Sequence, residues 1–145
     1  MTLQNLLETG QLREHEASAE EIRHLFDAAR RNLADAQVTA ISLETRFDAA
    51  YKAIMQLAMI ALLANGFRPG SGTGHHMTMI QTLPKSIGLS RQRVVTLDAL
   101  RRKRNAADYM GSYVDQTATD GCIVEAQALL LDVESWLSEH RPDLF

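Results

Sequence analysis

Apolar residues recur at spacings of three and four along most of this chain, which places them on one face of an α-helix. Proline occurs only at positions 69, 84 and 142, and no segment alternates apolar and polar residues as a strand does. A chain of 145 residues can form one domain around its own core. The sequence therefore predicts an all-α fold, an antiparallel up-and-down bundle of four to five helices, as a single domain over residues 1–145.

Capping residues indicate where the helices of the first half begin. Thr2 precedes a short helix that we expect to end near Gly10, within an N-terminal extension of residues 1–17. Ser18 is followed three residues later by Glu21, which is the pattern of a capping box. A first long helix is therefore expected to begin after Ser18.

A second long helix is expected to carry the core. The first should end near Val38, and the second should begin after Ser42 and end at Gly66. Residues 53–64 are apolar on most sides but too few to span a bilayer. Their packing partner is either the chain's own last helix or a second copy of the chain. With no basic, apolar segment at the N-terminus, we expect a cytoplasmic protein without a membrane anchor.

The second half begins with a glycine-rich connection, FRPGSGTGHH, which a helix could not absorb. Three helices are expected after it, over about His75 to Leu83, Ser90 to Gly111 and Thr119 to Glu139. Pro84 is expected to break the first of these helices. Cys122 is the only cysteine, so an intrachain disulfide is excluded.

The charge is unevenly distributed along the chain. Residues 1–50 carry a net charge of −4, residues 51–110 carry +7, and residues 111–145 carry −6. Six of the nine cations of the middle third lie between Arg91 and Arg104. This basic helix either neutralises its acidic neighbours, presents a solvated face, or binds an anion.

The stretch RRKRNAADYM ends the basic helix. Arg101, Arg104, Asn105 and Asp108 are spaced by three, four and seven residues and should share one face. A carboxylate in the last turn lies at the negative end of the helix dipole, which is unfavourable. Another interaction should therefore stabilise Asp108 at this position. It either pins an arginine for packing, or it orients an arginine that presents its guanidinium to phosphate.

His75 and His76 follow the glycine-rich connection. Side chains of adjacent helical residues point about 100° apart, so the two are a poor chelating pair, and we expect no metal site and no cofactor. If the loop folds over the basic helix, one of them could supply a base beside Arg104. Otherwise they cap carbonyls or remain solvated.

The segments DAAYKAIMQLAMIALLANGFRP, GHH and LRRKRNAADY follow one another within residues 42–139. In their order and spacing the chain resembles the HEPN superfamily of nucleotide-binding helical bundles, in particular members with an Arg-Asn-x-Ala-Asp-Tyr signature. The resemblance implies a homodimer with a polar cleft at its interface that binds RNA or a nucleotide. It also implies a toxin-antitoxin or defence pair beside a nucleotidyltransferase or antitoxin partner.

Ribonucleases of that superfamily carry an arginine followed, after four to six intervening residues, by a histidine. Here the corresponding residue after Arg104 is Tyr109, whose usual pKa of about 10 does not suit a base at neutral pH. The sequence leaves enzymatic activity open. If present, it is metal-independent RNA cleavage, with Arg104, Tyr109 and His76 as catalytic candidates.

Two functions remain from the sequence. In the first, RNA or a nucleotide binds a cleft formed by the following residues: Arg101, Arg104, Asn105, Asp108, His75 and His76. In the second, the chain is a non-catalytic protein-interaction module whose basic helix docks on an acidic partner protein.

Overall fold

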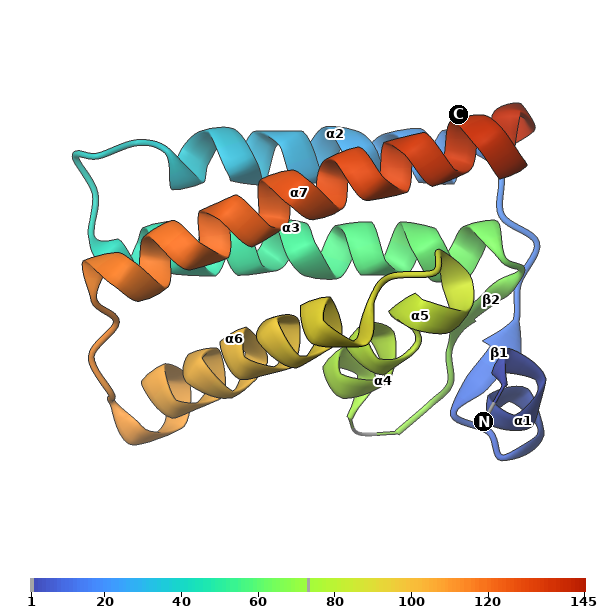
Figure 1. Ribbon diagram of the computed structural model, residues 1–145, viewed down its shortest axis with the longest axis horizontal. Helices are drawn as coiled ribbons and strands as arrows, with labels where there is room; N and C mark the ends of the chain where they lie inside the picture. Colours follow the sequence, from blue (N-terminus) through green and yellow to red (C-terminus); the bar gives the residue numbers. More distant parts are fainter. Residues whose placement is uncertain (1, 73) are drawn as a thin grey trace.

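The four long helices run in alternating directions, which confirms the predicted antiparallel bundle. The computed structural model describes residues 2–72 and 74–145. The long helices are α2 (Ala19–Ala36), α3 (Leu43–Ala64), α6 (Arg91–Met110) and α7 (Gln116–His140). Figure 1 shows α2 and α7 lying over α3, with α6 on the opposite side of α3. The short helices are α1 (Leu3–Glu8), α4 (His75–Gln81), α5 (Leu83–Ser86) and the 3-10 turn η1 (Pro142–Leu144).

The long helices α2, α3 and α6 begin where the sequence predicts. The side chains of Ser18, Ser42 and Ser90 each accept a hydrogen bond from the backbone N–H three residues on. Each serine thereby satisfies a donor that the first helical turn would leave unpaired. Gly111 ends α6 with a φ of 68°, a left-handed conformation that glycine adopts without steric cost.

Helix α3 is the core of the molecule. Its largest fully buried side chains include Phe47, Ile54 and Leu57, and the helix packs mainly against α2 and α7. By length and composition α3 could cross a membrane, but 72% of its most apolar window is buried inside the bundle. That burial is consistent with the core helix of a soluble protein. The chain's own helices therefore cover residues 53–64, and this apolar segment gives no reason to invoke a second copy.

A small sheet ties the N-terminal extension to the second half of the chain, and the sequence did not predict it. Strand β1 (Leu12–Glu14) pairs antiparallel with β2 (Phe67–Pro69), so that Leu12 lies opposite Pro69. Gly70 then passes so close to the extension that an added Cβ would overlap the carbonyl oxygen of Gly10. The extension therefore fixes the start of the glycine-rich connection that leads to α4 (Figure 1).

Several expected helix limits need correction. Pro84 does not end a helix; it lies in the first turn of α5, where a missing N–H costs nothing. Helix α2 ends at Ala36, two residues before Val38. Helix α7 begins at Gln116 rather than Thr119, because Asp115 caps it by accepting a hydrogen bond from the Ala118 N–H at 2.8 Å.

Candidate functional site

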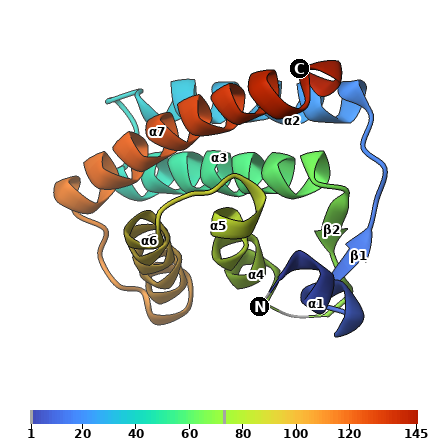
Figure 2. The same cartoon turned by 45° about the vertical axis from the view of Figure 1, so that its right-hand side comes forward.

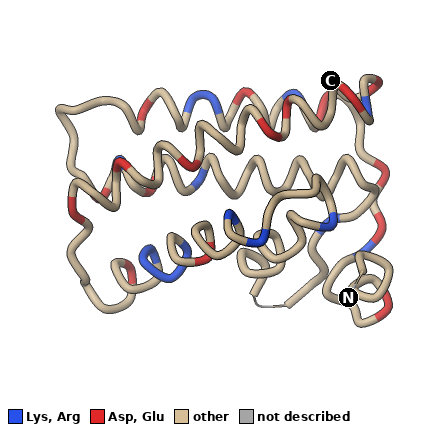
Figure 3. Tube along the Cα trace, in the orientation of Figure 1, with Lys and Arg blue, Asp and Glu red and all other residues tan. Residues whose placement is uncertain are grey.

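Arg93, in the N-terminal half of α6, is neutralised by α7. Figure 3 marks several Lys and Arg positions along α6 and several Asp and Glu positions along α7. Arg93 donates to Glu125 at 3.2 Å and to Asp132 at 2.8 Å, both on α7. At Arg93 the basic helix neutralises its acidic neighbours, which was one of the alternatives that the sequence left open.

The C-terminal half of α6 holds its charges differently. Asp98 accepts a hydrogen bond from Arg101 Nε at 2.8 Å and lies 3.2 Å from Arg102 Nε. One carboxylate of the same helix thus orients two adjacent guanidinium groups. The sequence analysis overlooked Asp98, although its spacings of three and four residues to these arginines predict the contact.

Arg104 lies over the ring of Tyr51, a buried residue of α3. Its Cζ is 5.1 Å from the ring centroid, within the range of a cation–π contact. Asp108 Oδ2 lies 3.2 Å from Arg104 Nε, which confirms the expected pair. The N–H does not point at that oxygen, so the buried Nε has no hydrogen-bond partner among the described residues. The guanidinium is positioned by an aromatic face and a carboxylate, without a hydrogen bond.

His76 reaches the same tyrosine from α4. Its Nδ1 and the Tyr51 hydroxyl form a hydrogen bond of 3.0 Å, and the two ring centroids are 5.6 Å apart. Gly74 precedes α4 with a φ of 81°, which turns the chain into this helix. Figure 2 shows α4 beside α6 beneath α3. The glycine-rich loop therefore brings His76 to the Arg104 face.

Both partners in this hydrogen bond are uncharged near neutral pH. Burial lowers the pKa of His76 below its usual value, and the positive charge of Arg104 adds to this effect. The hydrogen bond is partly buried, although His76 as a whole is exposed. Burial raises the pKa of Tyr51 to about 12. A neutral imidazole beside a cation is suited to accept a proton from a bound ligand.

A second acidic group lies at the rim of this cluster. Burial raises the pKa of Asp48, on α3, and the nearby charge of Asp108 adds to the increase, whereas Arg104 opposes it. Two carboxylates thus share the neighbourhood of one guanidinium. An anionic ligand must therefore compete with these carboxylates for Arg104, and it binds more easily when Asp48 is protonated.

The other sequence candidates are not part of this cluster. Tyr109 is 82% exposed, and His75 is also exposed. The Asn105 side chain, partly buried, makes no hydrogen bond within the described part of the chain. Cys122 is fully buried, and burial raises the pKa of its thiol to about 12. The arrangement therefore centres on Tyr51, His76 and Arg104, with Arg101 nearby.

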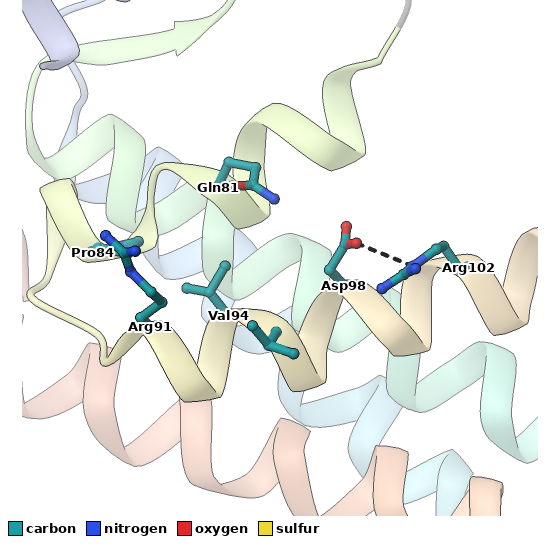
Figure 4. Close-up of a pocket in the computed structure, with 7 residues that line it drawn as sticks. Gln81, Pro84, Arg91, Val94, Asp98 and Arg102 are labelled. Atoms are coloured by element: carbon teal, nitrogen blue, oxygen red, sulfur yellow. Dashed lines mark ion pairs between the residues drawn. The ribbon is translucent and has the colours of Figure 1, made fainter. Parts of the chain in front are cut away.

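A pocket of about 330 Å³ lies between α6 and the pair α4 and α5. Figure 4 shows Gln81 of α4 across from Val94 and Asp98 of α6, with the Asp98–Arg102 ion pair at one end. The pocket is lined by Gln81, Pro84, Arg91, Val94, Val95, Asp98 and Arg102. It adjoins the turn of α6 that carries Arg101.

No group of three or more His, Cys, Asp or Glu side chains that could hold a metal occurs among residues 2–72 and 74–145. Compared with models of known protein families and with curated proteins, the chain gives no match.

Proposed function

We propose that this chain is a HEPN-like RNA-binding protein that cleaves RNA without a metal ion. The observation that carries the proposal is that Tyr51 contacts His76 and Arg104 at once, from two different helices. An imidazole and a guanidinium held on one half-open face are the two groups that this chemistry needs. The resemblance to HEPN bundles points to the same class of ligand.

The first step is phosphate binding. Arg104 makes no hydrogen bond to the described residues, so its terminal N–H groups are available to the paired oxygens of a phosphate. Arg101 lies close enough to affect the pKa of both Tyr51 and His76, and Asp98 fixes its orientation. Two oriented guanidinium groups would stabilise the extra negative charge that develops when phosphorus is attacked.

The second step is proton transfer by His76. The proposal requires the tautomer in which Nδ1–H donates to the Tyr51 hydroxyl oxygen, which leaves a lone pair on Nε2. Nε2 takes the proton of a ribose 2′-hydroxyl, and the 2′-oxygen forms a bond to the adjacent phosphorus. The bond from phosphorus to the 5′-oxygen breaks, and that oxygen takes a proton from water. The products are a 2′,3′-cyclic phosphate and a 5′-hydroxyl end.

The biological setting follows the resemblance. We propose a cytoplasmic homodimer that works in a toxin-antitoxin or defence-type pair beside a nucleotidyltransferase or antitoxin. In this assignment His76 replaces the missing motif histidine, and Tyr109 takes no part in proton transfer. Arg104 remains the catalytic candidate of the signature and binds the phosphate.

The experiment compares Arg104→Gln with Arg93→Gln. Both variants remove one positive charge from α6 at side chains of similar exposure, 31% and 28%. Binding is measured on a 2′-O-methyl RNA oligonucleotide, which cannot be cleaved, and cleavage on ordinary RNA with EDTA. Arg104→Gln should weaken binding about tenfold or more, since a hydrogen bond to a charged group contributes about 1.5–3 kcal/mol. Equal effects of the two variants would contradict a specific phosphate site.

A second candidate function is favoured by the end of α6. Tyr109, Met110 and Tyr113 are 77% to 82% exposed and lie close together in the sequence. Exposed aromatic and methionine side chains are typical of protein interfaces. If wild type binds no RNA but captures an acidic partner protein through these residues, the chain is the interaction module instead.

A further inference from the structure

The pocket between α4, α5 and α6 has the size and lining of a small ligand site. Its volume of about 330 Å³ is at the lower end of the range of about 300–1,000 Å³ for ligand pockets. Pro84, Val94 and Val95 give it apolar walls, and the Gln81 amide offers both a donor and an acceptor (Figure 4). It therefore suits a flat, apolar ring with polar edges.

The pocket opens on a stripe of α6 that carries two cations, an apolar and an aromatic side chain, and one carboxylate, Asp98. Arg91, Val95, Asp98, Arg102 and Tyr109 follow at spacings of four, three, four and seven residues, so they share one face. Val95 is 60% exposed, and Arg91 forms no ion pair within the described part of the chain. Cations interleaved with apolar and aromatic groups are typical of surfaces that bind single-stranded nucleic acid.

The pocket and the cluster around Tyr51 are neighbours on α6. Asp98 lines the pocket and also accepts a hydrogen bond from Arg101, whose charge acts on Tyr51 and His76. Arg91 and Arg102 stand eleven residues apart, about 16 Å along the helix axis. Cations at this separation can contact phosphates that are more than one nucleotide apart on a strand running along the helix.

We propose that this pocket holds one unstacked base of single-stranded RNA, on the same strand whose phosphate Arg104 binds on a neighbouring face of α6. The inference rests on the proposed function and deepens it, because it names the substrate class. Pro84 and Val95 contact the faces of the base, and Gln81 contacts its edge. A base in a duplex is stacked and paired and cannot enter such a pocket, so duplex RNA is excluded.

The test removes the bases without removing the charge. Binding to wild type is measured for a 2′-O-methyl uridine hexamer and for the matching hexamer without bases, which carries the same phosphates. Val95→Met places a longer, uncharged side chain at the pocket. Val124→Met is the matched control, because Val124 is also 60% exposed but lies on α7. Duplex RNA and the free uridine nucleotide are measured alongside.

Base removal should weaken binding to wild type and to Val124→Met about tenfold or more. In Val95→Met, removing the bases should weaken binding by no more than about twofold. Two results would overturn the pocket and leave the proposed function standing. In the first, binding depends on Arg104 but is equally tight with and without bases. In the second, wild type binds duplex RNA as tightly as the single strand. Free nucleotide bound as tightly as the hexamer would overturn RNA as the source of the base. Absence of all RNA binding would overturn both proposals.

Discussion

Arg93 and Arg104 lie eleven residues apart on α6 and are exposed to almost the same extent, yet their surroundings differ. Arg93 donates to two carboxylates of α7 and is held as a structural cation. Arg104 makes no hydrogen bond to the described residues and lies on the ring of Tyr51. The charge of a helix is therefore a poor guide to its function until the neighbouring helices are known.

The difference arises from which helix faces each end of α6. Helix α7 contributes Glu125 and Asp132 along its length, whereas α3 and α4 contribute an aromatic ring and an imidazole. Ion pairs between helices stabilise packing, and an unsatisfied guanidinium beside a neutral base is available for a ligand. Each prediction below tests that contrast.

Apart from changes of His76 itself, the largest effect is expected from Tyr51→Phe. This change removes the hydroxyl that fixes His76 and keeps the ring beneath Arg104. RNA cleavage should fall about tenfold to a hundredfold, since an unfixed base is less often correctly placed. Affinity for 2′-O-methyl RNA should stay within about twofold. Tyr113→Phe is the control, because that tyrosine is largely exposed, and equal cleavage by both variants would argue against the role of Tyr51.

Gly70→Ala is expected to act through the N-terminal extension. The added Cβ would overlap the Gly10 carbonyl, so the strand pair must shift. We expect a loss of about 1–3 kcal/mol in the free energy of unfolding, as for other overpacked sites, together with slower cleavage. Denaturant unfolding measures the first quantity. Gly121→Ala, in an open position of α7, is the control and should leave the free energy of unfolding unchanged or raise it. If Gly121→Ala lowered the free energy of unfolding as much as Gly70→Ala, the overlap with Gly10 would not be the cause.

The two arginines should differ in their effect on stability. Arg93→Gln breaks two ion pairs between α6 and α7 and should lower the free energy of unfolding by about 1 kcal/mol. Arg104→Gln should lower it by less, about 0.5–1 kcal/mol, because one ion pair within the helix and one cation–π contact with Tyr51 are lost. Urea unfolding of both variants measures the two losses. A larger loss for Arg104→Gln than for Arg93→Gln would contradict the contrast between the two arginines.

The smallest effect is expected from pH. The folded chain binds a proton at His76 less readily than the unfolded chain, because burial lowers the pKa of His76. Its contribution to stability is therefore complete above the unfolded pKa of about 6.5 and is lost as pH falls through the lowered folded value. Unfolding of wild type and His76→Gln from pH 7.5 to 5 should show this loss in wild type alone. A pKa of His76 above 6.5 by NMR would reverse the sign and remove the neutral base.

The sequence predicts the long helices well because their signals are local. Serine caps, the glycine at the end of α6 and the apolar face of α3 each act within a few residues. Strands β1 and β2 have three residues each and pair across more than fifty residues of chain, so no periodicity reveals them. Pro84 was misjudged because proline interrupts a helix interior but fits a first turn.

The candidate site was predictable only where its residues share a helix. The Arg104–Asp108 pair follows from a spacing of four, and Asp98 could have been found in the same way. The contact of His76 with Tyr51 depends on how the glycine-rich loop folds back under α3, which the sequence leaves open. Tyr109, the last residue of the signature, is exposed to solvent because it lies on a different face of α6 from Arg104.

The central claim is that His76 supplies the base that α6 lacks, and its most direct test is metal-free RNA cleavage by His76→Gln and His75→Gln. The two histidines are adjacent and both exposed, so the pair controls for general effects of the substitution. His76→Gln should lower the cleavage rate by roughly 10² to 10⁴, with affinity for 2′-O-methyl RNA unchanged, and His75→Gln should cleave like wild type. The account would be contradicted if His76→Gln cleaved RNA at the wild-type rate, or if wild type did not cleave RNA.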